Sequence, residues 1–188
     1  KHIGVELAKE SPVEADLVIP VPDSGVPAAI GYAQQSGIPF ELGIIRSHYV
    51  GRTFIQPEDG ARHADVKRKH NANRALVAGK RIILIDDSIV RGTTSLKIVQ
   101  MMRDAGAAEV HMRVASPPTE HSCFYGVDTP ERHKLLAARM NVQGMAEYIH
   151  ADSLAFVSID GLYRAVGEKQ RKTACPQHCD ACFTGEYP

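Results

Sequence analysis

The sequence predicts an α/β fold in which a mostly parallel sheet is flanked by helices. Two observations indicate this fold class. Short apolar runs alternate with segments of helical periodicity, which is the pattern of strands joined by helical crossovers. The clearest run, Ile82 to Ile85, is apolar at every position, as expected of a strand buried on both faces. With 188 residues, of which 44% are hydrophobic, the chain can bury one such core.

The first part of the chain alternates between helices and strands. Pro27 suits the first turn of a helix, and Gly37 marks the end of that helix. The apolar pattern predicts helices over residues 2–10 and 27–35 and strands over residues 17–21 and 41–45.

The stretch from Arg52 to Lys80 breaks this pattern, because it is polar, rich in basic residues and without clear periodicity. A stretch of this length inside a compact domain is usually a functional loop. A solvated surface is the alternative interpretation of its charges. We expect a basic flap that covers an anionic substrate and excludes water from it.

The second part of the chain returns to the alternation. The patterns predict strands over residues 81–85 and 109–115 and helices over residues 94–105, 131–139, 144–150 and 160–166. From Gly167 onward the chain is polar and carries three of its four cysteines. We therefore expect a domain over residues 1–166 and an appended cysteine-bearing segment over residues 167–188.

The segment over residues 81–95 is the most informative part of the sequence. Asp86 and Asp87 directly follow the buried strand, so they lie at its carboxyl end, where open α/β sheets bind their ligands. Ser88 to Ser95 form a hydroxyl- and glycine-rich turn into a helix, whose backbone N–H groups suit an anion. Because carboxylates cannot hold a phosphate, ribose hydroxyls or a magnesium ion would be the partners of the aspartates. These features predict a site for a phosphorylated sugar.

A simpler interpretation of the same segment is an acidic strand end followed by a serine or threonine helix cap. An Asp-Asp pair alone would favour that interpretation. The order of four apolar residues, two carboxylates, a glycine and two threonines favours the sugar phosphate site instead.

The segment resembles the loop that binds phosphoribosyl pyrophosphate (PRPP) in type I phosphoribosyltransferases. Three further segments resemble the glutamine PRPP amidotransferase family: residues 18–25 (VIPVPDSG), 49–57 (YVGRTFIQP) and 179–188 (CDACFTGEYP). The resemblance implies the type I phosphoribosyltransferase fold, with a mostly parallel five-stranded sheet and a flexible loop. It also implies a reaction of PRPP with ammonia that gives 5-phosphoribosylamine and pyrophosphate and opens purine synthesis.

The resemblance assigns roles at two strand ends. The pyrophosphate would bind the loop of Asp23, Ser24 and Gly25, although these residues alone are also typical of an ordinary turn. Asp86 and Asp87 would be catalytic residues that fix the ribose. Magnesium would be held by Ser24 together with these two aspartates.

The resemblance also assigns residues to the 5-phosphate and to the basic loop. The residues expected to bind the 5-phosphate are Ser88, Val90, Arg91, Gly92, Thr93, Thr94 and Ser95. The cations expected to act on the leaving pyrophosphate are Arg52, Lys69 and Arg74.

The four cysteines are Cys123, Cys175, Cys179 and Cys182. The Cys179-x-x-Cys182 pair with a distant cysteine suits metal or iron–sulfur ligation. The resemblance implies a [4Fe–4S] cluster on Cys123, Cys179 and Cys182, with the fourth ligand outside this chain and Cys175 as a bystander. A zinc site on Cys175, His178, Cys179 and Cys182 is the alternative. With one ligand missing, we expect the cysteine segment to be mobile or held by packing alone.

Composition excludes several classes of protein. Basic and acidic residues balance at 22 each, which argues against a nucleic-acid surface. No apolar stretch approaches the roughly 20 residues needed to cross a bilayer, and no signal segment is evident. We therefore expect no nucleic acid, no membrane and a cytoplasmic location.

The resemblance further implies a homo-tetramer that purine nucleotides inhibit, and a glutaminase domain that releases ammonia from glutamine. That domain is absent from this chain, which is expected to use ammonia directly. Two rival functions are a salvage phosphoribosyltransferase that couples PRPP to a nucleobase and a regulatory protein that senses PRPP without turnover. Residues 49–57 and the cysteine segment argue against the first rival, and the intact pyrophosphate loop argues against the second.

Overall fold

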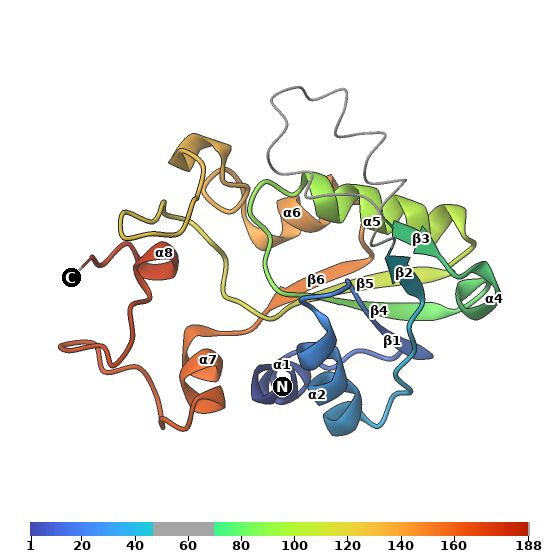
Figure 1. The fold of residues 1–188 in the computed structure, drawn as a ribbon, viewed down its shortest axis with the longest axis horizontal. Helices are drawn as coiled ribbons and strands as arrows, with labels where there is room; N and C mark the ends of the chain where they lie inside the picture. The colour runs from blue at the N-terminus through green and yellow to red at the C-terminus, as the bar shows by residue number, and fades with distance from the viewer. Residues whose placement is uncertain (47–69, 188) are drawn as a thin grey trace.

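The structure is a computed structural model that describes residues 1–46 and 70–187. Its centre is a four-stranded sheet in the order β1-β4-β5-β6, in which every neighbouring pair is parallel (Figure 1). The strands are β1 (Leu17–Pro20), β4 (Arg81–Asp86), β5 (Glu109–Val114) and β6 (Ser153–Phe156). This confirms the predicted α/β fold with a mostly parallel sheet.

Helices cover both faces of this sheet (Figure 1). One face carries α1 (His2–Glu10), α2 (Val26–Ser36) and α7 (Ile159–Ala165). The other face carries α5 (Thr93–Asp104) and α6 (Val142–Tyr148). The sheet is therefore the middle layer of three.

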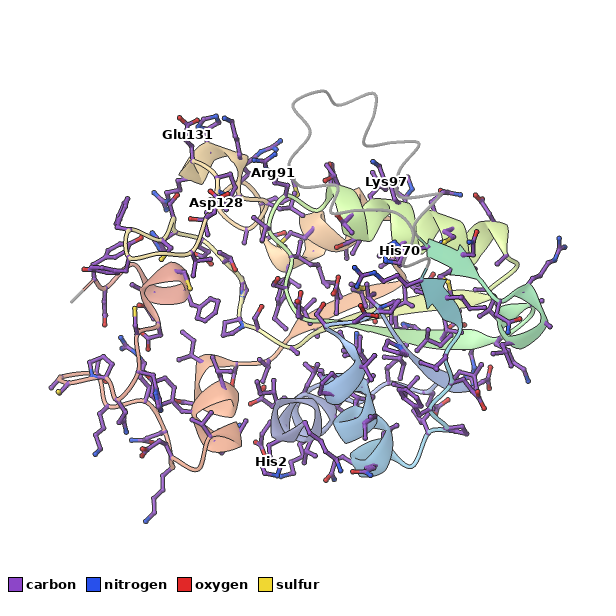
Figure 2. The ribbon with its side chains drawn as sticks, in the orientation of Figure 1. His2, His70, Arg91, Lys97, Asp128 and Glu131 are labelled. Atoms are coloured by element: carbon purple, nitrogen blue, oxygen red, sulfur yellow. The ribbon has the colours of Figure 1, made fainter. Side chains whose placement is uncertain are left out.

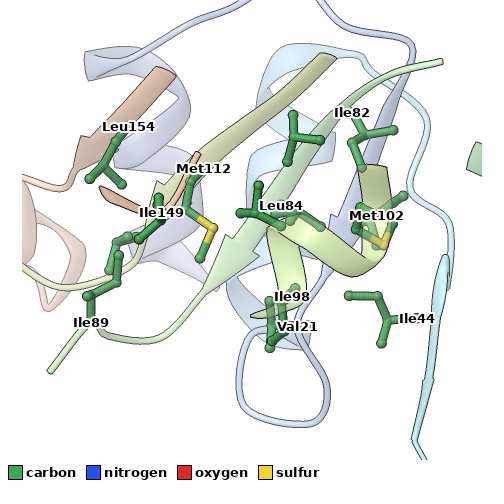
Figure 3. Packing of buried hydrophobic residues seen from close by; sticks show 14 of the residues in the cluster. Val21, Ile44, Ile82, Leu84, Ile89, Ile98, Met102, Met112, Ile149 and Leu154 are labelled. Atoms are coloured by element: carbon green, nitrogen blue, oxygen red, sulfur yellow. The ribbon is translucent and has the colours of Figure 1, made fainter. Parts of the chain in front are cut away.

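Strand β4 is apolar at consecutive positions because its side chains alternate between these two helical layers. Ile82 and Leu84 pack in the cluster that contains Ile98 and Met102 of α5 (Figure 3). Ile83 and Ile85 join the second cluster, on the α1 and α2 side. All four side chains are fully buried. At about 1.5–3 kcal/mol for each buried side chain, the burial of β4 fixes the strand that carries the two aspartates.

The predicted fifth strand is reduced in the described residues. Phe40 makes an isolated parallel bridge to Val18, and the predicted strand over residues 41–45 begins only at Ile44. Pro39 accepts a hydrogen bond from Val18 N but has no N–H of its own to extend the ladder. Instead β2 (Ile44–Arg46) pairs antiparallel with β3 (His70–Ala72) as a separate two-stranded sheet.

Several predicted elements are confirmed and one is wrong. Helices form at the predicted positions 2–10, 27–35, 94–105, 144–150 and 160–166, with small shifts in their ends. The predicted helix over residues 131–139 is only the short 3₁₀ turn η2 (Arg132–Lys134). Leu135 is extended after this turn, and Leu136 N donates to Val90 O at 2.8 Å. Because the Leu136 N–H is bonded to the loop that contains Val90, it cannot form the hydrogen bond of a helix at this position.

Some elements were not predicted. These are β3, the short helix α4 (Arg74–Val77), the edge strand β6 and the C-terminal helix α8 (Ala181–Thr184). Part of the expected loop, residues 70–72 and 74–77, is therefore regular structure, whereas residues 52–69 lie outside the described ranges. Within those ranges, no helix is both long and apolar enough for a membrane span.

Candidate active site

Asp86 and Asp87 lie at the carboxyl end of β4, as predicted. Asp86 is the last residue of the strand and is only 6% exposed, whereas Asp87 is exposed. Asp86 Oδ1 accepts a hydrogen bond from Asp87 N at 2.9 Å, and Asp87 Oδ1 accepts one from the Ser88 hydroxyl at 3.0 Å. Neither carboxylate has an ion pair within residues 1–46 and 70–187. The site therefore presents two carboxylates whose charge no described side chain neutralises.

Burial, and then the charge of Asp87, raise the pKa of Asp86 to about 7. The group is consequently poised between its two protonation states near neutral pH. A cation or a set of hydroxyl donors at this position would favour the charged state and lower the pKa again. This response to a ligand is typical of a functional carboxylate.

The loop over residues 21–25 lies directly against the end of β4. Val21 N donates to Ile85 O at 2.8 Å, and Gly25 N donates to Val21 O at 3.0 Å. A Cβ atom at Gly25 would lie 2.3 Å from Ile85 O, so no larger residue fits there. Close packing of two backbones thus explains the glycine, and it joins the predicted pyrophosphate loop to the aspartate loop.

The side chains of Ser24 and Asp23 in this loop differ in whether they are free to bind a ligand. Ser24 is exposed, as a ligand-binding hydroxyl would be. Asp23 is also exposed, but its carboxylate forms an ion pair with Arg46 at the end of β2. Arg46 was not singled out from the sequence, because only the folded chain brings β2 beside the end of β1.

The turn before α5 has the geometry of an anion site. Gly92 has a φ of +77° and is the N-cap residue of α5. Thr93 and Thr94 are exposed, Ser95 is buried, and the first turn of this 12-residue helix contains no acidic residue. The N-terminal amides and partial positive charge of α5 therefore face the loop without competition from a carboxylate in that turn.

Two residues that the sequence did not reveal shape the same turn. A Cβ atom at Gly92 would lie 2.5 Å from Leu136 Cδ2 and 3.0 Å from Tyr148 Cε1. The Leu136 backbone also donates to Val90 O. Gly92 is thus required both by its left-handed backbone and by the wall that Leu136 and Tyr148 form.

Two of the predicted basic residues, Arg91 and Arg74, lie within the described residues. Arg91 is exposed, and it lies in the part of the molecule where Asp128 and Glu131 are found (Figure 2). Arg74 is exposed in α4, the helix that directly precedes β4. Its expected role beside the pyrophosphate stays a prediction. The other two cations, Arg52 and Lys69, lie outside the described residues.

Three of the four cysteines are neighbours at the other end of the molecule. Burial raises the pKa of the Cys182 thiol, and the charges of Cys179 and Cys123 raise it further, as expected of adjacent thiols. The Cys123 sulfur accepts a hydrogen bond from Tyr125 N at 3.4 Å, and this bond and the nearby amides of Val127 and Gly126 lower the pKa of Cys123. Such amide contacts support a thiolate ligand.

The cysteines do not form a closed ligand set in the structure. Among the described residues, no three histidine, cysteine or acidic side chains are grouped closely enough to hold a metal ion. The alternative zinc set of Cys175, His178, Cys179 and Cys182 is likewise not assembled there. Cys175 is exposed, which agrees with its interpretation as a bystander.

The cysteine segment is attached more firmly than we expected. Asp180, between Cys179 and Cys182, is 4% exposed and forms an ion pair with Arg171 of the same segment. It also accepts a hydrogen bond from the Tyr163 hydroxyl of α7 at 2.9 Å, which attaches the segment to the domain. Burial alone would raise the pKa of Asp180, but hydrogen bonds from Arg171 and Tyr163 outweigh burial and hold that pKa below its usual value. The expectation of a segment that is mobile or held by packing alone is wrong in this respect. The charge partners of Asp180 were not evident from the sequence, because Arg171 is only one of several basic residues there.

The comparisons with known proteins agree with the fold. Residues 5–119 match the model of the phosphoribosyl transferase domain. The chain therefore belongs to the phosphoribosyl transferase domain family.

The chain is also similar in sequence to longer proteins. Over 189 aligned residues the chain is 66% identical to the amidophosphoribosyltransferase of Rhizobium etli, covering 100% of this chain and 38% of that protein. It is 53% identical to the amidophosphoribosyltransferase of Bacillus subtilis, covering 100% of this chain and 39% of the relative. The chain thus spans about two fifths of the length of these relatives.

A solved structure shows the same arrangement. The chain superposes on the glutamine PRPP amidotransferase of B. subtilis, solved in complex with ADP and GMP, with a TM-score of 0.87 and 52% identity. The match covers 100% of this chain and 41% of that one.

Proposed function

We propose that this chain is the phosphoribosyltransferase portion of an amidophosphoribosyltransferase. It transfers the 5-phosphoribosyl group of PRPP to ammonia and forms 5-phosphoribosylamine and pyrophosphate, the first committed step of de novo purine biosynthesis. The observation that carries the proposal is the contact of the loop over residues 21–25 with Ile85, the residue before Asp86 in β4. This contact places the loop and residues 86–95 at the carboxyl ends of neighbouring parallel strands. The names of the relatives support the choice of ammonia as the acceptor.

The two loops suit the opposite charges that develop in this reaction. The bond from the anomeric carbon to the pyrophosphate oxygen breaks, a bond to the ammonia nitrogen forms, and a proton leaves the new amine for solvent. Positive charge on the ribose is stabilised by Asp86 and Asp87. The backbone of residues 21–25 and the amino end of α5 hold the pyrophosphate and the 5-phosphate. Neutral ammonia needs no general base, so positioning and electrostatics carry the catalysis.

Magnesium fits the chemistry of the donors at this edge. Ser24, Asp86 and Asp87 offer hard oxygen ligands, and the raised pKa of Asp86 marks a carboxyl group that gains from a nearby cation. Bound magnesium would supply positive charge to the pyrophosphate as that group leaves. Asp23 is not included, because Arg46 already occupies its carboxylate. Arg52, Lys69 and Arg74 stay predicted cations for the same pyrophosphate.

The cysteines support a [4Fe–4S] cluster in the longer protein. Cys123, Cys179 and Cys182 are neighbouring thiols, and the Cys123 sulfur already receives an amide hydrogen bond. A cubane cluster takes four ligands, so the fourth would come from outside this chain. In this proposal residues 1–166 are the catalytic domain and residues 167–188 the cluster-binding segment.

The longer protein is proposed to obtain its ammonia from glutamine through a separate glutaminase domain. We further propose that it is a cytoplasmic homo-tetramer and that purine nucleotides inhibit it. The nucleotides in the similar solved structure support the inhibition proposal, since they are ADP and GMP.

An acceptor comparison tests this function. The chain is mixed with PRPP and magnesium, and pyrophosphate release is measured with ammonium at pH 8 or with adenine, guanine or hypoxanthine. We expect release only with ammonium. Release with a nucleobase would establish a salvage enzyme, and binding of PRPP without release under any condition would establish a PRPP sensor.

A further inference from the structure

A buried carboxylate, Asp180, lies between Cys179 and Cys182 in the C-terminal segment. Asp180 Oδ2 accepts hydrogen bonds from Arg171 Nε at 2.5 Å and from the Tyr163 hydroxyl at 2.9 Å. Asp180 Oδ1 accepts from Arg171 Nη2 and from the Thr184 hydroxyl, each at 3.2 Å. Both oxygens are therefore satisfied by protein donors.

We propose that Asp180 is a positioning residue that presets Cys179 and Cys182 for metal binding. This inference rests on the cysteine site described under the proposed function. Asp180 would not contact the metal, because its two oxygens are already occupied by Arg171, Tyr163 and Thr184.

The donors to Asp180 connect the cysteine turn to the folded domain. Tyr163 is buried in α7, and Arg171 N donates to Asp160 Oδ1 in the first turn of that helix at 3.1 Å. Arg164 of the same helix pairs with Glu6 and Glu10 of α1. Asp180 is thus tied through α7 to the layer of helices that covers the sheet.

The same residue organises the backbone around Cys182. Asp180 O accepts hydrogen bonds from Phe183 N at 2.9 Å and Thr184 N at 3.1 Å, which shape the turn that contains Cys182. On its other side, Cys182 O accepts from Glu120 N and His121 N, each at 3.1 Å. These contacts hold Cys182 beside the segment that carries Cys123. The turn is consequently ordered by protein contacts alone, before any metal binds.

Preorganisation of this kind should be measurable as metal affinity. Residues that orient metal ligands typically contribute a factor of about 10–100 in affinity, because the ligands do not have to be ordered during binding. Glu186 provides a matched control. It pairs with the same Arg171 at 2.5 Å, but its side chain is 57% exposed and it lies outside the Cys-x-x-Cys turn.

The experiment is a cobalt titration of the reduced chain under anaerobic conditions. Co²⁺ is added to the unaltered chain, to Asp180→Asn and to Glu186→Gln, and the thiolate-to-cobalt charge-transfer absorbance is followed. Circular dichroism at the same temperature checks that each protein is folded. We expect Asp180→Asn to lose about 10–100-fold in cobalt affinity and Glu186→Gln to lose less than about threefold.

Tyr163→Phe keeps the test decisive if Asp180→Asn does not fold. It removes one of the four donors to Asp180 and should weaken cobalt binding by at least about threefold. Equal affinity of the unaltered chain and the folded Asp180→Asn or Tyr163→Phe variant would overturn the positioning role. An equal loss in Glu186→Gln would also overturn it. Absence of the charge-transfer band in the unaltered chain would contradict the cysteine site itself and leave the PRPP reaction unaffected.

Discussion

Asp86 and Asp180 are both buried aspartates, but they differ in how many hydrogen-bond donors surround the carboxylate. Asp180 receives hydrogen bonds from Arg171, Tyr163 and Thr184, and the pKa of Asp180 lies below its usual value. Asp86 receives one hydrogen bond from the backbone of Asp87 and has the charge of Asp87 beside it, so its pKa is raised to about 7. The carboxylate of Asp180 is satisfied by the fold, and we propose that the carboxylate of Asp86 gains its partner from a ligand.

The difference indicates which part of the molecule each aspartate serves. A buried charge that is fully paired costs the fold much when a partner is removed. A buried charge without a cation lowers the stability of the folded state. Such a destabilising group is typical of a functional site. Asp180 therefore serves the attachment of the cysteine segment, and Asp86 is assigned to the proposed substrate site.

The largest effect is expected at the substrate site. Replacement of both Asp86 and Asp87 by Asn should weaken magnesium-dependent PRPP binding by at least about 100-fold, because each lost charge-assisted contact costs about 1.5–3 kcal/mol. Isothermal calorimetry measures the affinity, and circular dichroism should show an intact fold. Binding of unchanged strength would break the assignment of the carboxyl end of β4 to PRPP.

The next effect concerns the attachment of the cysteine segment. Arg171→Met leaves Asp180 buried without its cation, and we expect the melting temperature to fall on the order of 5–10 °C. Glu186→Gln removes only the exposed partner of Arg171 and should change the melting temperature by less than about 2 °C. If both variants melt alike, the ion pair of Asp180 is no more important than a surface contact, and the comparison fails.

Replacement of Asp86 is expected to change the stability of the fold in the opposite direction, from loss to gain. Its pKa is higher in the folded chain than the usual value of 3.8, so the folded state binds more protons and loses stability as pH rises from about 4 to about 7. Asp86→Asn removes this penalty and should stabilise the ligand-free chain by about 1–4 kcal/mol at pH 8. The gain should nearly vanish at pH 4. Urea unfolding at the two pH values measures it, and a loss of stability at pH 8 would show that Asp86 supports the fold.

The sequence predicted the parts of the site that are continuous in the chain. The aspartates follow directly from the buried strand, and Gly92 and Gly25 mark turns at strand ends. The same is true of the helices with regular apolar spacing. These features depend on local backbone geometry and burial, which the order of residues expresses directly.

The sequence did not predict contacts between distant segments. The ion pair of Asp23 with Arg46 and the wall of Leu136 and Tyr148 over Gly92 arise only when separate loops meet. The helix expected over residues 131–139 fails for the same reason, because Leu136 bonds to the Val90 loop. Arg74 was grouped with the basic stretch by its position in the chain, but it lies in α4, a short helix that the sequence did not predict.

The most direct test of the unpaired state of Asp86 is the proton released when PRPP binds. At pH 7 a group with a pKa of about 7 is half protonated, and ligand hydroxyls or magnesium would favour its charged form. Calorimetry with magnesium and PRPP in buffers of different ionisation enthalpy gives the number of protons released by the unaltered chain and by Asp86→Asn. We expect the unaltered chain to release about half a proton more than the variant, and its affinity for PRPP to fall as pH decreases below 7. Equal proton release by the two proteins would show that Asp86 does not change its protonation state when PRPP binds.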